Sequence, residues 1–525
     1  MWKKTRLILL LILAAFFVGS LPTISAIIND TVIYSVKEGI SLHPHAVARL
    51  ASLMETLKHY TWHIIFVYAI ITAFIIFMEG QNPDRTILWM LTLVFVPVLG
   101  VLVYLVIGPR FNSYKKMLSL SHGRDTVPQR DMSPFTRDAR YRTGQLLHSS
   151  NGAELTTHNR IDVLINGDAT FSAIKAELRA AKHFIHMQYF IINDDELGRE
   201  IGDILIDAAR RGVKVRLLYD AIGSWKLTKK YTDALEEAGI ECNSFMPVSF
   251  ARFRRKLNFR NHRKIIVIDG KVAFTGGLNI GDEYMGRGPL GHWRDTHVRV
   301  EGEAVAELHK IFLCDWCFRT DDNAEEACER FTDGIEHDFS DLPTTPVQVV
   351  KSGIGSPWHA ISQGYCSMIA RAEKRIWITT PYLVPGPVLM NAMVNAALSG
   401  IDVRIIIPEK KDHFLVHWGS RGNIAPLLCA GARVFFYENG FIHTKSLVSD
   451  GNICSVGTCN LDVRSLEINF ENQLFIYNDK LSAEFEAQFE KDMCDCRELS
   501  LGEWLKRPFR EKVLESFGKL YSAQI

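Results

Sequence analysis

The sequence predicts an α/β protein in which two similar half-domains pack about a pseudo-twofold cleft, preceded by a helical hairpin in a membrane. Three observations support this prediction. Strand and helix patterns alternate through most of the chain. A motif at residues 261–279 returns at residues 442–460 with the same internal spacing. Near the N terminus, two long apolar stretches without charged residues follow each other closely.

Residues 1–110 contain three apolar stretches, at residues 7–28, 62–78 and 87–107. The second and third lack Asp, Glu, Lys and Arg and are about long enough to cross a bilayer, so we expect a transmembrane hairpin. The first is either a signal peptide or a first membrane helix, which would have to be re-entrant or lie on the surface. By the positive-inside rule, the cations after the third stretch place the rest of the chain in the cytoplasm: Arg110, Lys115, Lys116, Arg124 and Arg130.

Composition narrows the function classes. A chain of 525 residues exceeds one ordinary core, and its net charge of +1 gives no overall signal for nucleic acid. The ten cysteines form no disulfide framework, which indicates a reducing compartment. Cys314 with Cys317, and Cys494 with Cys496, have spacings that metal ligands also show. Both pairs fall in helical patterns and no histidine completes a set, so we predict no metal and no cofactor.

The catalytic body is predicted to consist of two halves. An irregular linker at residues 111–157 precedes the first half, residues 158–320, in which we expect a mostly parallel sheet. An acidic linker at residues 321–345 leads to the second half, residues 346–500. Short segments of the second half repeat the first in the same order: Gly400–Arg404 echoes Gly212–Arg216, and Ala430–Arg433 echoes Ala238–Glu241. We therefore expect both copies of the motif to share one cleft.

Each copy of the motif places a histidine and a lysine two residues apart at the start of a predicted strand. The pairs are His262 with Lys264 and His443 with Lys445. Alternation along a strand puts both side chains of a pair on one face. Phosphodiester exchange without a metal needs a nucleophile, an acid for the leaving alkoxide, and cations for the phosphate oxygens. Two imidazoles and two ammonium groups supply all of these, although the residues alone do not say which histidine attacks.

Further polar residues complete each copy. Asp269 and Asp450 follow the lysines at an odd spacing, so they complete the His-Lys-Asp sets but should point off the active face as buried residues that hold the strands. Asn279 and Asn460 follow glycines that let the backbone approach a ligand, and we expect them to bind phosphate. Each histidine also needs an acceptor that fixes its tautomer. Asp295 in the first half and Glu471 in the second are the candidates.

Two other segments have open interpretations. Residues 252–256, with Arg260 and Arg263, form either a solvated loop or a basic lip that attracts anionic headgroups. Residues 501–525 carry apolar side chains at helical spacing with cations between them. This amphipathic segment either packs on the body or lies on the bilayer surface.

The paired motif resembles that of the phospholipase D superfamily. Further segments resemble its bacterial cardiolipin synthase branch: GGLNIGDEY at residues 276–284, WRDTHVRVEG at 293–302, CDW at 314–316 and RSLEINFEN at 464–472. The resemblance covers about residues 60–525. One departure is Thr458, where the second motif more often has Ser, and the hydroxyl is kept.

This resemblance implies a reaction and a location. The chain would transfer a phosphatidyl group between two phosphatidylglycerol molecules, giving cardiolipin and glycerol through a phosphohistidine. His262 would be the nucleophile and His443 the acid and base. The enzyme would be a multi-pass protein of the bacterial inner membrane, with anionic phospholipid and the bilayer as partners. Alternatives are a hydrolase of the phospholipase D type, a nuclease, which the membrane segments disfavour, and a lipid-binding scaffold without catalysis, which would need neither His-Lys pair.

Overall fold

The computed structural model separates the chain into two compact units, Met1–Pro109 and Arg110–Ile525. It describes residues 66–67, 70–71, 73–74, 87, 89–93, 141–246, 259–320, 338–353 and 358–522. Among the residues so described, no helix has the length and hydropathy needed to cross a bilayer. The predicted apolar segment 7–28 lies outside them, as do most of residues 62–78 and 87–107, residues 252–256 of the basic segment, and residues 321–337 of the acidic linker.

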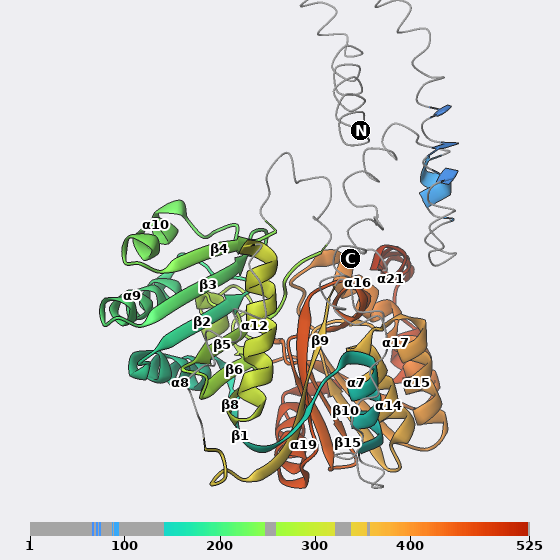
Figure 1. Cartoon of the computed structure of the whole chain (residues 1–525). Helices are drawn as coiled ribbons and strands as arrows, with labels where there is room; N and C mark the ends of the chain where they lie inside the picture. The colour runs from blue at the N-terminus through green and yellow to red at the C-terminus, as the bar shows by residue number, and fades with distance from the viewer. Residues whose placement is uncertain are drawn as a thin grey trace, which may run out of the picture. The chain divides into compact units, whose positions relative to one another are not determined.

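The first half starts with a helix and a long strand and then alternates (Figure 1). Its strands are β1 (Leu155–Ile165), β2 (Phe184–Tyr189), β3 (Lys214–Asp220), β4 (Glu241–Phe245), β5 (Ile265–Ile268), β6 (Val272–Gly276), β7 (Trp293–Arg294) and β8 (Thr296–Gly302). Its helices are α7 (Tyr141–Asn151), α8 (Asn166–Ala180), α9 (Glu196–Arg210), α10 (Lys229–Glu237), the short η1 (Asp282–Met285) and α12 (Ala304–Thr320).

The second half repeats this pattern. Its strands are β9 (Thr344–Ser352), β10 (Arg375–Thr379), β11 (Leu383–Val384), β12 (Asp402–Pro408), β13 (Arg433–Tyr437), β14 (Phe441–Ile442), β15 (Ser446–Ser449), β16 (Ile453–Gly457), β17 (Leu461–Asp462), β18 (Glu471–Ile476) and β19 (Cys496–Glu498). Its helices are α14 (Ala360–Arg371), α15 (Gly386–Leu398), α16 (Phe414–Gly422), α17 (Ile424–Cys429), α18 (Val463–Glu467), α19 (Asp479–Met493), α20 (Leu501–Leu505) and α21 (Phe509–Ser522).

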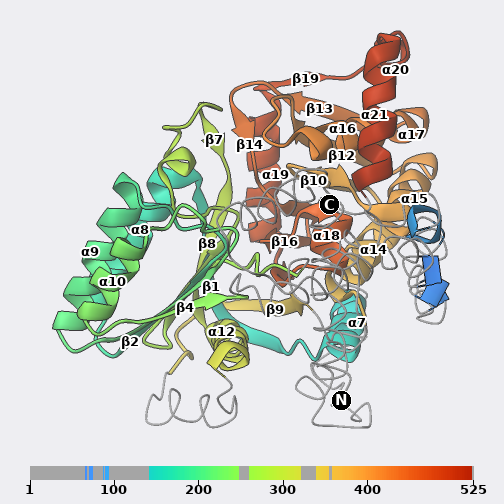
Figure 2. The same cartoon turned by 90° about the horizontal axis from the view of Figure 1, so that it is seen from above.

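One continuous sheet joins the two halves. Its strand order is β19-β13-β12-β10-β15-β16-β18-β9-β1-β8-β6-β5-β2-β3-β4. Read outward from the central β9–β1 pair, the strands of the two halves correspond: β18 with β8, β16 with β6, β15 with β5, β10 with β2, β12 with β3 and β13 with β4. This mirrored order confirms the duplication inferred from the repeated motif. Figure 2 shows the two halves side by side, with α8, α9 and α10 on one flank and α14, α15 and α17 on the other.

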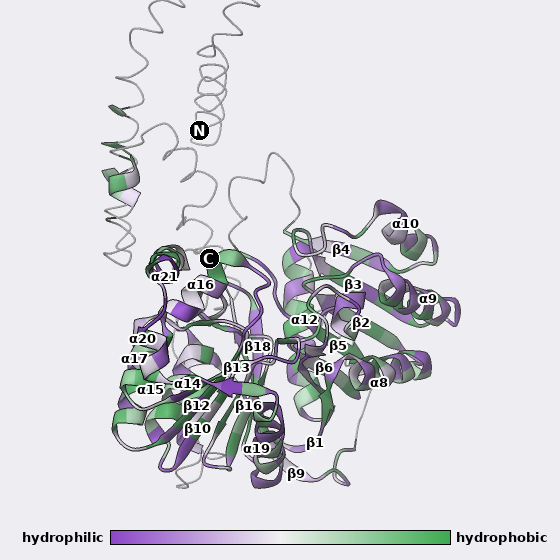
Figure 3. Ribbon diagram, turned by 180° about the vertical axis from the view of Figure 1, so that it is seen from behind, coloured by the Kyte–Doolittle hydropathy of each residue, from purple (hydrophilic) through white to green (hydrophobic). Residues whose placement is uncertain are grey.

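The halves also share a hydrophobic core. Buried residues of α12, such as Leu308 and Trp316, belong to the same cluster as Val456 and Leu474 of the second half. Separate clusters fill the space between the sheet and the outer helices of each half. Hydrophobic colours accordingly run along the strands in Figure 3. Because one core spans both halves, their relative position is fixed by apolar burial as well as by the central strand pair.

Two expectations about this body differ from the structure. The sheet is mixed and not mostly parallel: β2–β3 and β3–β4 are parallel, but β2–β5, β5–β6, β6–β8 and β1–β8 are antiparallel. The reason is that tight turns such as the one after β5 return the chain antiparallel. Residues 141–157, which we assigned to a linker, form α7 and the start of β1. Leu147 of α7 is fully buried in the core of the second half, next to α14 (Figure 1).

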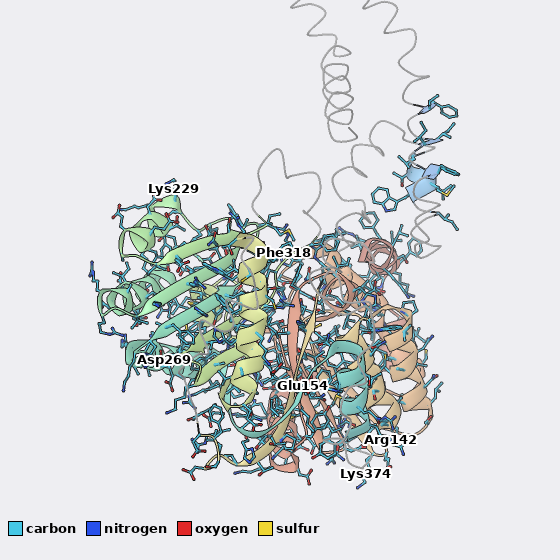
Figure 4. All side chains as sticks on the ribbon, in the orientation of Figure 1. Arg142, Glu154, Lys229, Asp269, Phe318 and Lys374 are labelled. Carbon is cyan, nitrogen blue, oxygen red and sulfur yellow. The ribbon has the colours of Figure 1, made fainter. Side chains whose placement is uncertain are left out.

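Asp269 and Asp450 occupy equivalent turns and are half-buried, not buried as we expected. Both adopt a left-handed backbone with φ of 52°, which Asp tolerates better than most residues, and each precedes a glycine. The Asp269 carboxylate accepts hydrogen bonds from the backbone N–H groups of residues 182, 183 and 184, each at 2.8 Å. Asp450 does the same for residues 373, 374 and 375. Figure 4 shows Asp269 and Lys374 at the periphery of their halves. These contacts tie the β5–β6 and β15–β16 turns to the starts of β2 and β10.

Replacement of Asp269 by Ala should therefore cost stability and leave the chemistry of folded molecules unchanged. We expect Asp269→Ala to lower the free energy of unfolding by about 2 kcal/mol, because three N–H groups lose a charged acceptor. Denaturant unfolding measures this change. Asp207→Ala on the exposed side of α9 is the matched control and should change stability by less than about 0.5 kcal/mol. Equal stability of both variants would contradict the assigned role.

Candidate active site

The two His-Lys pairs lie in extended segments just before β5 and β15, not within the strands as we expected. Each segment is held against the other half of the molecule. His262 N–H donates to Phe470 O at 2.9 Å, and His443 N–H donates to Arg294 O at 2.7 Å. The short strands β14 and β7 extend the second of these contacts into a parallel ladder. The backbone of each pair is therefore fixed next to the residue that precedes a predicted acceptor, Glu471 or Asp295.

Each histidine contacts the carboxylate of the opposite half. His262 Nδ1 lies 2.9 Å from Glu471 Oε1, and His443 Nδ1 lies 2.8 Å from Asp295 Oδ2. The sequence identified one acceptor in each half, but the structure pairs them crosswise. A carboxylate at Nδ1 favours a proton there and leaves Nε2 as the atom that can attack phosphorus or exchange a proton.

The lysines and histidines of the two halves form one cluster. Lys264 Nζ donates to His262 O at 2.7 Å, and Lys445 Nζ donates to His443 O. Both lysines are buried, and desolvation lowers the pKa of Lys264 to about 7 and that of Lys445 to about 8. Each ammonium group has further N–H bonds with which it can hold a phosphate oxygen.

Burial also controls the charge of the histidines. Desolvation lowers the pKa of His262 and of His443 to about 4, and the lysines of both halves contribute to this shift. The histidines are therefore neutral at pH 7 in the free protein, as a nucleophile requires. Because Lys445 acts on His262 and Lys264 acts on His443, the two imidazoles face a common electrostatic environment.

The two acceptors are ionised although both are fully buried. Burial alone would raise the pKa of Glu471, but His262 and Lys264 outweigh it and hold the pKa below its usual value. Lys445 and His443 do the same for Asp295. Thr458 Oγ1 also donates to Glu471 at 2.5 Å. The equivalent position in the first half is Gly277, where an added Cβ would come within 2.1 Å of Asp295 Oδ1.

The two predicted phosphate-binding asparagines are placed differently. Asn279 Oδ1 accepts from Ile191 N at 3.2 Å, and Asn279 Nδ2 donates to Tyr284 OH at 3.0 Å. Asn460 is also buried, but its Oδ1 has no hydrogen-bond partner in the described part of the chain. The side chain of Asn460 is thus less committed to the protein than that of Asn279. Tyr284 was not identified from the sequence because it lies outside the repeated motif.

Arg263 is not part of an exposed basic lip, and neither is Arg260. Both side chains are buried, and Arg260 pairs with Asp220 at 3.3 Å. Arg263 forms two bonds to Asp315 of α12, at 2.6 and 2.5 Å. These carboxylates explain why arginines next to the motif are turned inward: a buried cation needs a partner.

Arg263 also fixes the position of Glu471. Its Nε donates to Glu471 O at 3.1 Å, and its Nη2 donates to Ser352 O at 2.6 Å. Arg263 directly follows His262 in the chain. Its side chain therefore links this segment to α12 of the first half and to the backbone of Glu471 in the second half. We call Arg263 with Asp315 the first arginine clamp.

A second arginine clamp holds the other pair. Arg294, the residue before Asp295, donates to Asp492 of α19 at 2.7 Å and to Asp295 O at 2.6 Å. It also donates to Thr444 Oγ1, next to His443, at 3.1 Å. The two clamps perform the same task with arginines at different positions of the repeat. Sequence reasoning missed both because the repeat does not align Arg263 with Arg294.

Within the described ranges, no group of three His, Cys, Asp or Glu side chains is arranged to hold a metal ion. The fold therefore brings together the predicted His262, Lys264, His443 and Lys445 with Asp295 and Glu471. It places Asp269 and Asp450 at the far ends of the hairpins.

Comparisons with known proteins identify the family to which the chain is similar. Residues 174–316 and 365–493 match the family described as "Cardiolipin synthase, PLD-like domain", and residues 64–109 match "Phospholipase_D-nuclease N-terminal". The chain is 38% identical to "Cardiolipin synthase 2" of Bacillus anthracis, over 87% of this chain and 90% of that protein. It is also 38% identical to "Major cardiolipin synthase ClsA" of Bacillus subtilis, over 87% of this chain and 98% of that protein.

A solved structure shares the fold. The phosphatidylserine synthase of Haemophilus influenzae is 16% identical, with a TM-score of 0.57, and the match covers 73% of this chain and all of that one. At this identity the likeness concerns architecture. It shows that the mixed α/β body is a known arrangement.

We expect Arg263→Lys to impair catalysis by displacing Glu471 from His262. Lysine keeps the charge opposite Asp315 but cannot make the same set of planar bonds. The expected result is a fall in kcat of about tenfold with a smaller change in KM. Combined with Glu471→Gln, Arg263→Lys should add little, because both act through one hydrogen bond. Steady-state rates of the single and double variants measure the coupling.

The second clamp provides the matched control. Asp492→Asn should be non-additive with Asp295→Asn and additive with Glu471→Gln, since it belongs to the other histidine. If Arg263→Lys were additive with both carboxylate variants, the arginine would have only a general structural role.

Anion binding should be linked to proton uptake by the lysines. Because their pKa values are about 7 and 8 in the free protein, a bound anion favours their charged forms and binding weakens as pH rises above 7. We expect sulfate affinity to fall by up to about tenfold per pH unit for each titrating lysine between pH 7 and 9. Calorimetry in two buffers of different ionisation enthalpy measures the protons taken up. Lys264→Met should abolish part of the uptake and Lys229→Met on the surface should not, whereas a pH-independent affinity would contradict the depressed lysine pKa values.

Proposed function

The chain belongs to the family of cardiolipin synthases with phospholipase D-like domains, and we propose that its two histidines carry out the family's reaction on two molecules of phosphatidylglycerol. It is a phosphatidyltransferase of phospholipid biosynthesis that makes cardiolipin. The observation that carries the proposal is the crosswise pairing of His262 with Glu471 and of His443 with Asp295. This pairing gives one cluster of side chains two equivalent imidazoles, as a two-step exchange requires.

In the first step, one histidine attacks and the other protonates. We assign the attack to His262, whose Nε2 forms a bond to the phosphorus of the first lipid. The bond from phosphorus to the glycerol headgroup breaks, and His443 as imidazolium gives its proton to the departing oxygen. The pKa of His443 in the free protein is about 4, so it must rise when the anionic phosphate binds next to it. Asp295 stabilises the imidazolium.

The second step reverses the proton transfer. A hydroxyl of the second phosphatidylglycerol attacks the phosphorus of the phosphohistidine and gives its proton to His443. The bond between phosphorus and His262 Nε2 breaks, its electron pair returns to the imidazole, and cardiolipin leaves. Lys264, Lys445 and the amide of Asn460 hold the phosphate oxygens, with Asn279 shaping the opposite wall. General acid and base assistance of this kind contributes about 10²–10⁴ in rate.

We further propose that residues 1–110 hold the enzyme in the bacterial cell membrane. Two uncharged apolar stretches, 62–78 and 87–107, support this proposal, as does the N-terminal family match at residues 64–109. The cations that follow the third stretch support a cytoplasmic location of the catalytic halves. Such an anchor holds the enzyme on the membrane that supplies its lipid substrate.

Product analysis tests the reaction. The purified full chain, given phosphatidylglycerol labelled in its acyl chains and headgroup, should release labelled cardiolipin and free glycerol. His262→Ala and His443→Ala should each lower the rate by at least about 10³-fold. His183→Ala, an exposed histidine outside the cleft, should keep full activity. Phosphatidic acid as the sole product would identify a hydrolase, and product formation by both catalytic variants would favour a scaffold.

The roles of the two histidines can be separated with a substrate that needs no acid. In phosphatidyl-p-nitrophenol the leaving phenolate departs without a proton. His443→Ala should therefore release nitrophenolate once and accumulate an acid-labile phosphatidyl group on His262. His262→Ala should show no burst. A label found on His443 instead would reverse the assignment.

A further inference from the structure

The exposed side of α21 carries a row of large apolar side chains. Phe509, Val513, Phe517 and Leu520 recur three or four residues apart, so they lie along one side of the helix. Their exposed fractions range from 46% to 81%, and Leu505 at the end of α20 extends the row. A contiguous apolar surface of this kind marks a site of interaction.

The inward side of α21 fixes this orientation. It packs on α16, where a Cβ built at Gly518 would come within 2.5 Å of Gly419 N, and one at Gly422 within 3.1 Å of Glu515 O. Backbones this close leave no room for the helix to rotate. The apolar row therefore stays on the outer side.

The acidic and basic side chains of α21 lie on different sides of the helix. Both glutamates turn inward: Glu511 pairs with Arg421 at 3.7 Å, and Glu515 accepts from Arg507 Nη2 at 3.1 Å. Of the residues from Leu505 to Leu520 that the structure shows as exposed, several are cations and none is a carboxylate. The exposed cations next to the apolar row include Lys506, Arg510 and Lys512. Cations beside an apolar row complement an anionic lipid surface.

The helix beneath α21 begins beside the active site. Asp412, just before α16, accepts a hydrogen bond from Tyr382. Its negative charge also acts to raise the pKa of Lys445, against the larger effect of desolvation. Phe414 at the start of α16 is exposed. In the first half, Trp225 is 75% exposed on a loop whose Ser224 donates to Phe190 O, and the Phe190 ring lies 4.9 Å from that of His262. Exposed aromatic side chains therefore lie near members of the histidine–lysine cluster in both halves.

We propose that α21 docks on an anionic phospholipid bilayer, with its apolar row in the interface and its cations at the headgroups. The docking holds the second half at the surface from which lipids enter the cleft. The benefit to catalysis rests on the proposed function, but docking itself needs no turnover. A failure of the docking test is thus distinguishable from a failure of the reaction.

Fluorescence quenching of the full chain in vesicles tests the docking. An environment-sensitive dye is attached at Phe517→Cys, in a background where Cys314, Cys328, Cys429 and Cys494 are Ser. In vesicles of phosphatidylglycerol and phosphatidylcholine we expect a blue-shifted emission that lipid-borne doxyl groups quench. A blue shift without quenching means that protein covers the row, either the N-terminal unit or a second copy, and overturns the proposal. Unshifted emission means exposure to water and overturns it as well.

A kinetic experiment measures the consequence. Phe509→Ser with Phe517→Ser should need about threefold to tenfold more phosphatidylglycerol in mixed vesicles for half-maximal rate, with an unchanged kcat. Val388→Ser with Leu398→Ser removes two exposed apolar side chains from α15 and should change neither value. Equal behaviour of the two double variants would overturn the proposal.

Discussion

Neither half of this protein can complete a buried histidine–carboxylate pair by itself. His262 depends on Glu471 and His443 depends on Asp295, and both contacts cross from one half to the other. All four groups are buried, so a separated half would expose an imidazole without its acceptor and a carboxylate without its cation. The continuous sheet, the shared core and the two arginine clamps all serve to keep these crossings in register.

The charges of the cluster also determine how it responds to substrate. Two carboxylates face two lysines whose positive charge is weakened by burial, and the two imidazoles are neutral. A phosphodiester adds one negative charge, which favours full protonation of the lysines and of one imidazole. In the proposed reaction, substrate binding thus favours the imidazolium that serves as the general acid. This linkage avoids burying an uncompensated cation in the free protein.

The sequence predicted the residues of the repeated motif and both acceptors, and missed how the two halves combine them. His262, Lys264, His443 and Lys445 were found because each copy of the motif keeps their spacing. The crosswise pairing could not be found, because it depends on how the halves meet and not on spacing within either half. Asp315 lies on α12 and Asp492 lies on α19, so the two aspartates occupy similar places in their halves. Their arginine partners do not: Arg263 follows a histidine of the cluster, whereas Arg294 precedes an acceptor carboxylate.

Backbone geometry explains the other differences. The spacing correctly predicted that Asp269 and Asp450 point away from the active face. It could not predict the left-handed turn, in which each carboxylate is half-exposed and accepts hydrogen bonds from three backbone N–H groups. The same hairpins made the sheet mixed. The alternation of strands and helices predicted the α/β class and most element positions, because the apolar runs are long and regular.

Small departures from symmetry fit the unequal roles proposed for the two histidines. Glu471 accepts from Thr458 as well as from His262, whereas Gly277 places no side chain on Asp295. An acceptor that already receives a hydroxyl proton attracts the imidazole proton less, so Glu471 favours a neutral His262 over an imidazolium. Asp295 lacks that hydroxyl and accepts instead from the backbone N–H of Thr296 at 2.8 Å. A threonine in one copy of the motif and a glycine in the other thus give different surroundings to the two imidazoles, to which we assign attack and proton transfer.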